Sequence, residues 1–163
     1  MNVYDKSEID RIEKVIAKNE AMDNFFKEKR ETWTKNIEKL FEVLQFDIDN
    51  PSTSSEIFNA QALALTYKQK MSDEISVFLN KRTIEVAKLK KLKQDKFLFY
   101  AIGFQVKTNK GEKDILINGH IAQNERTMEL IESYIEFLRD SSDNLKTFGY
   151  SIKNMIELMN YLK

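Results

Sequence analysis

The sequence contains no cysteine, a single proline and four glycines among its 163 residues. Without cysteine the chain can form no disulfide and offers no thiolate for catalysis or metal binding. Proline and glycine most often end helices and form tight turns, so their scarcity leaves few positions at which short strands could be joined. We therefore expect a mainly α protein built from long amphipathic helices.

Residue patterns for catalysis are scarce as well. His120 is the only histidine, which excludes a site built from several imidazoles, and we expect it at the end of a hairpin or helix. The glycines are too scattered to form a loop that cradles a phosphate. We expect no metal, no cofactor and no enzymatic activity, and residue spacing alone leaves open only a nuclease built from carboxylates.

Long hydrophobic runs are absent too. No segment approaches the roughly 20 apolar residues that a membrane-spanning helix needs, and the first residues lack the basic start and apolar run of a signal peptide. Hydrophobic residues make up 42% of the chain and charged residues 32%, which is typical of a folded domain with exposed helices. We expect a soluble intracellular protein with no membrane partner.

A polar linker separates two parts of the chain. Residues 1–50 form an N-terminal helical extension, in which apolar side chains from Ile9 to Leu44 recur at spacings of three and four and predict a helix over residues 7–46. The linker, residues 47–56, holds the only proline and several serines and threonines. The helix either packs on its own domain or mediates self-association, and both interpretations remain open.

The second part, residues 51–163, begins with another long helix. Thr53 and Glu56 have the spacing of a capping box, in which each side chain bonds to the other's free backbone N–H, so we expect this helix to begin near Ser54. Its apolar pattern continues for about 40 residues, or roughly 60 Å. That length exceeds what one small core requires and indicates assembly.

The pattern changes at Phe97. Residues 97–106 are almost continuously apolar and rich in aromatics, residues 115–118 are rich in β-branched side chains, and turn-forming residues lie between them around Asn109 and Gly111. Two short apolar segments joined by an exposed turn predict a short β-hairpin.

Helices are expected again after the hairpin. One is predicted over residues 121–138, and after a break at residues 140–144 a last helix over residues 144–162, capped by Ser142 or Asp143. The last helix is sharply amphipathic. Its apolar face is formed by Leu145, Phe148, Ile152, Met155, Ile156 and Met159.

The charge of the chain is unevenly distributed, although 26 basic and 26 acidic residues cancel overall. Residues 1–50 carry 9 basic and 12 acidic side chains, residues 114–163 carry 5 and 8, and residues 51–113 carry 12 and 6. A basic middle between two acidic flanks is typical of an anion-binding element. Its densest part precedes the aromatic segment and consists of Lys88, Lys90, Lys91, Lys93 and Lys96.

These lysines spread around much of the helix circumference and repel one another, a cost that a polyanion would relieve. Single-stranded nucleic acid is the favoured ligand, because phosphate contacts are independent of sequence and aromatic rings can stack on bases. A solvated helix face and an anionic lipid surface are the alternatives. For the aromatic residues, packing in the core is favoured over stacking on bases; they are Phe97, Phe99, Tyr100 and Phe104.

From about Phe58 onward, the chain resembles the UvsY family of phage recombination mediator proteins. A long helix with Tyr67 and Lys68 ends in the basic stretch KLKKLKQDK, which runs into Phe99-Tyr100 and then Gly103. The other similar segments are Lys113-Asp114-Ile115-Leu116 and the closing LKTFGYSIKNMIELM, and residues 1–50 have no counterpart.

The resemblance implies a non-enzymatic protein that binds single-stranded DNA as a ring-like homo-oligomer. Family members help to load a RecA-like recombinase onto DNA covered by single-strand-binding protein. Their DNA-contacting residues correspond to Lys93 and Lys96, with Lys90 and Lys91 beside them, and their oligomerisation region corresponds to the apolar face of the last helix. For a phage protein, the expected location is the host cytoplasm. The alternative is a helical scaffold or adaptor that binds protein partners and no nucleic acid.

Overall fold

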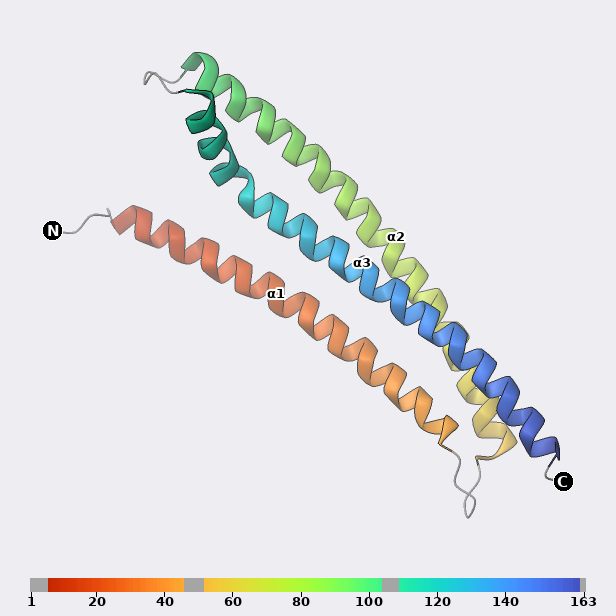
Figure 1. The fold of residues 1–163 in the computed structure, drawn as a ribbon. Helices are drawn as coiled ribbons and strands as arrows, with labels where there is room; N and C mark the ends of the chain where they lie inside the picture. The colour runs from red at the N-terminus through yellow and green to blue at the C-terminus, as the bar shows by residue number, and fades with distance from the viewer. Residues whose placement is uncertain (1–5, 46–51, 104–108, 162–163) are drawn as a thin grey trace. The chain divides into compact units, whose positions relative to one another are not determined.

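The computed structural model describes residues 6–45, 52–103 and 109–161, and the regular structure in these ranges is entirely helical. Three long helices occupy most of them: α1 (Lys6–Phe41), α2 (Ser54–Leu98) and α3 (Lys110–Tyr161) (Figure 1). A 3₁₀ turn, η1 (Glu42–Leu44), follows α1, and a π-helical segment, η2 (Phe99–Gly103), extends α2. The prediction of a mainly α fold with long helices is confirmed.

The chain divides into two compact units. Unit 1 comprises Met1–Ala64 and Thr147–Lys163, and unit 2 comprises Leu65–Lys146, so the boundaries fall within α2 and α3. Residues 46–51, which hold the first half of the predicted linker, lie outside the described residues, and the predicted division at residues 50 and 51 stays a prediction. None of the helices in the described ranges is both long and apolar enough to cross a membrane.

Unit 1 contains α1, the start of α2 and the end of α3. The ring of Phe41, the last residue of α1, lies 5.2 Å from the ring of Phe148 on α3, centroid to centroid. Leu40 is buried, as the apolar spacing of α1 predicts, whereas Ile12 is exposed and the side chain of Ile9 lies outside the described part. The apolar stripe of α1 therefore contributes to the core over only part of its length.

The start of α2 is fixed by the capping box that the sequence predicts. The backbone N–H of Thr53 donates to Oε2 of Glu56 at 2.7 Å, and the backbone N–H of Glu56 donates to Oγ1 of Thr53 at 3.2 Å. The helix begins at Ser54, which confirms the prediction. Hydrogen bonds from the Thr53 backbone N–H and hydroxyl stabilise the carboxylate and hold the pKa of Glu56 below its ordinary value.

In unit 2, α2 and α3 run antiparallel: residues later in α2 contact residues earlier in α3. The rings of Phe78 and Tyr134 lie 5.0 Å apart, and farther along α2 the hydroxyl of Tyr100 lies 2.8 Å from Nε2 of His120. The end of α2 and the start of α3 therefore lie at the same end of this helical hairpin (Figure 1).

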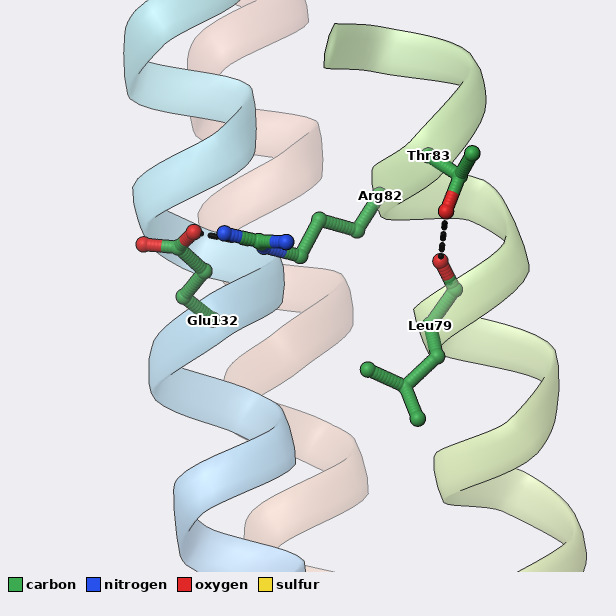
Figure 2. Close-up of polar contacts among 4 residues, drawn as sticks. All are labelled: Leu79, Arg82, Thr83 and Glu132. Atoms are coloured by element: carbon green, nitrogen blue, oxygen red, sulfur yellow. Dashed lines mark hydrogen bonds and ion pairs between the residues drawn. The ribbon is translucent and has the colours of Figure 1, made fainter.

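An ion pair crosses between the two helices in the middle of unit 2. Nε of Arg82 on α2 donates to Oε1 of Glu132 on α3 at 2.6 Å (Figure 2). On the neighbouring turn the hydroxyl of Thr83 donates to the backbone carbonyl of Leu79 at 3.0 Å, within α2 itself. The side chains of Arg82 and Glu132 are 43% and 46% exposed, so water screens the pair and its stabilisation is about 0–1 kcal/mol.

The predicted β-hairpin is wrong. Residues 97–103 are helical, as the end of α2 and as η2, and residues 115–118 lie inside α3, while residues 104–108 are outside the described residues. Asn109 and Glu112 explain the difference: each backbone N–H donates to the other's side-chain oxygen at 2.9 Å. The segment that looks like a turn is a second capping box, and it starts α3.

Packing also favours helix over strand in this region. Ile117 and Ile121 are one helical turn apart on α3 and are buried in a cluster with Leu89 and Tyr100 from α2. In a strand Ile115 would share the buried face of Ile117, but Ile115 is 71% exposed, as the helical period requires. Burial of that face outweighs the intrinsic preference of isoleucine for strands.

The break predicted at residues 140–144 is wrong as well. The helix α3 passes through this segment without interruption, so neither Ser142 nor Asp143 begins a new helix. Ser141 is buried in register with Leu138 and Leu145, three residues before it and four after it. A small serine thus completes the buried face, and the penalty for serine, aspartate and asparagine inside a helix, below about 0.7 kcal/mol each, is outweighed.

Candidate nucleic-acid interface

The C-terminal part of α2 turns one face to the core and the others to solvent. Leu89 and Tyr100 are buried with Ile117 and Ile121 of α3, and Leu92 packs against this cluster. Four of the five lysines predicted to bind phosphate are exposed on the remaining circumference, and the fifth, Lys96, is half-buried. We refer to residues 88–103 together with residues 110–120 as the basic end of unit 2.

Two of the five lysines predicted to bind phosphate extend into solvent from α2. Lys90 and Lys91 are exposed, and neither forms an ion pair within the part of the chain that the structure describes. An uncompensated ammonium on an exposed helix face can approach a phosphate without first breaking an existing contact. These two residues therefore fit a phosphate-binding role most directly.

Two others already contact a carboxylate. Nζ of Lys88 donates to Oε1 of Glu85 at 2.6 Å on α2, and Nζ of Lys93 donates to Oε1 of Glu125 on α3 at 3.1 Å. The lysine side chains are 60% and 48% exposed, so both ammonium groups are open to competition from another anion, although Glu85 itself is only 19% exposed.

Lys96 occupies a third kind of environment. It is half-buried, and its Nζ lies 6.0 Å from the centroid of the Phe99 ring, at the outer limit of a cation–π contact. Its position places a positive charge between the lysine stretch and the aromatic segment.

The aromatic residues of the basic end do not share one environment. Tyr100 is buried and contacts His120, which lies within α3 and not at the end of a hairpin or helix. Phe97 and Phe99 are 60% and 50% exposed, so the expectation that they pack in the core is wrong. Tyr100 and, four residues before it, the half-buried Lys96 lie on the side of the helix toward the core, and Phe97 lies on another side. Phe104 lies outside the described residues.

The start of α3 adds positive charge beyond the five lysines of α2. Lys110 and Lys113 lie in its first turn, and the antiparallel pairing brings that turn to the end of unit 2 where the lysines of α2 lie. In the sequence, the capping-box spacing of Asn109 and Glu112 indicates that a helix begins here, where a hairpin turn was predicted.

Most of the residues predicted for oligomerisation are already covered within the monomer. Leu145, Phe148, Ile152 and Met155 are buried, and Phe148 contacts Phe41 of α1. Only the other two face outward: Ile156 is exposed and Met159 is half-buried. A partner chain could therefore reach the predicted surface only at its edge, unless the fold of unit 1 opens.

A different face of the same helix is apolar and exposed. Tyr150, Leu158 and Tyr161 lie within about 80° of one another around the end of α3, and all three are exposed. An open groove of about 380 Å³ runs beside them. Its lining consists of Leu44, Ser151, Asn154, Met155 and Leu158.

Comparisons with protein-family models, curated proteins and solved structures find no match to this chain.

Proposed function

We propose that this protein binds single-stranded DNA without catalysing a reaction, and that the basic end of unit 2 is the binding surface. One observation carries the proposal: Lys90 and Lys91 are exposed and unpaired in the described part of the chain, a few residues from the exposed ring of Phe97. Lysines can contact the phosphates of a nucleic acid whatever its base sequence. An exposed ring beside them suits bases that are not already stacked in a duplex.

The charges of the surface support an anionic ligand. Residues 88–103 and 110–120 carry seven lysines against Asp95, Glu112 and Asp114, in a chain that is neutral overall. Such a concentration of one sign attracts polyanions and accelerates their association. The two existing ion pairs of Lys88 and Lys93 add contacts that a phosphate can take over.

The experiment is a titration of the full-length protein against a labelled single-stranded oligonucleotide, followed by fluorescence anisotropy at several salt concentrations. We expect binding that weakens linearly with the logarithm of salt concentration, because each lysine–phosphate contact releases a counterion. A duplex of the same length should bind more weakly. Indifference to the oligonucleotide at low salt contradicts the proposal, and binding to anionic vesicles alone assigns the surface to lipid.

The larger role that we propose is that of a recombination mediator, in which a ring-like homo-oligomer loads a RecA-like recombinase onto DNA covered by single-strand-binding protein. This part is supported by the resemblance in the stretch KLKKLKQDK and in the closing helix. Several copies of a weak DNA-binding surface would bind one strand with high avidity. The test is the DNA-dependent ATP hydrolysis of a RecA-like recombinase on covered DNA, whose lag this protein should shorten.

The exposed face of α3 favours a second candidate function, a helical scaffold or adaptor. Tyr150, Leu158 and Tyr161 beside an open groove form an apolar surface of the kind that protein partners cover. A scaffold would be indifferent to DNA, and its capture of partners from a lysate would be lost when Leu158 is changed to Asp. The anisotropy titration therefore distinguishes the two functions.

A further inference from the structure

We infer that Phe97 is a base-stacking residue that makes the basic end selective for unpaired nucleic acid; this inference rests on the proposed function and specifies its ligand. The ring of Phe97 is 60% exposed. No ring or cation contact to it occurs among the described residues, whereas Phe99 has Tyr100 and Lys96 beside it. A fully apolar ring left open to water at this position is available to a planar partner.

The position of Phe97 relative to the lysines indicates which chemical groups the ligand carries. Lys90, Lys93 and Phe97 follow one another at spacings of three and four residues, so their side chains emerge on one face of α2. This face extends over roughly 10 Å of helix. A strand whose phosphates contact the two ammonium groups would bring a base within reach of the ring.

The core-facing residues show why Phe97 cannot turn inward. Leu89 and Tyr100 are buried against α3, and the hydroxyl of Tyr100 is held 2.8 Å from Nε2 of His120. At about 100° per residue, Phe97 is rotated about 80° from Leu89 and about 60° from Tyr100 around the helix. The buried neighbours thus hold the ring outward.

Stacking distinguishes this ligand from other polyanions. Every base has an aromatic face, so stacking tolerates any sequence, but bases inside a duplex already stack on one another and are closed to a side chain. Lipid headgroups and duplex DNA offer phosphates without accessible base faces. The inferred ligand is therefore a flexible single strand with unpaired bases, bound through both its phosphates and its bases.

The test compares two labelled strands of the same length, about 15 nucleotides: oligothymidine, and an abasic strand that has the phosphates without the bases. Wild-type protein should bind oligothymidine at least about 5-fold more tightly than the abasic strand. Phe97→Leu should lose most of this preference and leave the abasic affinity unchanged, whereas Phe97→Tyr should restore it. The matched control is Phe58→Leu, because Phe58 is 72% exposed on α2 and lies outside the basic end.

The outcomes separate this inference from the proposed function. Equal binding of both strands by wild-type protein, or an unchanged preference in Phe97→Leu, overturns the stacking role and leaves phosphate binding intact. Wild-type protein that binds neither strand at low salt overturns the proposed function and the stacking role with it. Helical circular dichroism of each variant confirms that an exposed substitution has left the fold unchanged.

Discussion

Nζ of Lys93, in the basic end of unit 2, lies 3.1 Å from Oε1 of Glu125, which follows the basic end on α3. The contact joins the two helices and at the same time neutralises a lysine that is predicted to bind DNA. Its partners are 48% and 43% exposed, so it stabilises the fold by about 0–1 kcal/mol. A phosphate can therefore displace Glu125 at little cost.

Glu125→Gln should strengthen binding to single-stranded DNA. The substitution frees Lys93 from its carboxylate and removes a negative charge that repels phosphates, so we expect affinity to rise a few-fold. The log–log salt slope should stay close to the wild-type value, because phosphate already displaces Glu125 from Lys93 in the wild-type complex. Anisotropy titrations at several salt concentrations measure both effects. The control is Glu157→Gln, which removes the same charge beside Lys153 in unit 1. Equal effects of the two variants would assign the change to net charge alone.

The capping box at the start of α2 should make stability depend on pH in a defined direction. Because the folded-state pKa of Glu56 is lowered, its contribution is present above the ordinary value of 4.5 and is lost as the pH falls through the folded-state pKa. Wild-type protein should therefore melt at a higher temperature than Glu56→Gln at neutral pH. Thermal unfolding at a series of pH values should show this difference shrinking below pH 4.5. A difference that stays constant down to strongly acidic pH would contradict the role of the carboxylate.

The core of unit 1 should depend on Phe148 much more than on Leu158, although both lie on α3. Phe148 is buried against Phe41, so Phe148→Ala should lower the free energy of unfolding by about 3–5 kcal/mol. Leu158 is half exposed, and Leu158→Ala should cost less than about 1 kcal/mol. Urea unfolding followed by circular dichroism measures both values. Similar losses in the two variants would show that the face of α3 toward the core has been misassigned.

Oligomerisation should respond to the exposed edge of the predicted surface and not to its buried centre. Ile156→Asp should leave the monomer folded, because Ile156 is exposed, and should reduce the mass of the assembly measured by light scattering. Ile152→Asp should instead unfold unit 1, because it places a charge at a buried position. If Ile156→Asp keeps both the wild-type mass and the wild-type helicity, this face of α3 does not mediate assembly.

The sequence predicts helix starts well where a local motif is sufficient. Thr53 and Glu56 define the start of α2 by their spacing alone, and the structure contains the predicted hydrogen bonds. The same motif at Asn109 and Glu112 does not by itself predict a helix, because glycine and asparagine between apolar segments are equally typical of a hairpin turn. Only the pairing of α3 with α2 decides between the two structures.

The sequence predicts the lysines of the candidate site but not which of its aromatic rings are exposed. The lysines from Lys88 to Lys96 can be identified from the sequence, because they are close together along the chain whatever its fold. Exposure of Phe97 depends on which face of α2 meets α3, because Phe97 lies only three residues before the buried Tyr100. The burial of Ser141, which keeps α3 continuous, likewise follows from tertiary packing.

The central claim is that the exposed lysines of the basic end bind single-stranded DNA, and the double variant Lys90→Ala/Lys91→Ala tests it most directly. Anisotropy titrations against a single-stranded oligonucleotide over a range of salt should show weaker binding and a log–log slope reduced by about 1.4, because two phosphate contacts are lost. The matched control, Lys14→Ala/Lys18→Ala, removes two exposed lysines from α1 and should bind almost as wild type does. Wild-type affinity and slope in the Lys90→Ala/Lys91→Ala variant would contradict the account.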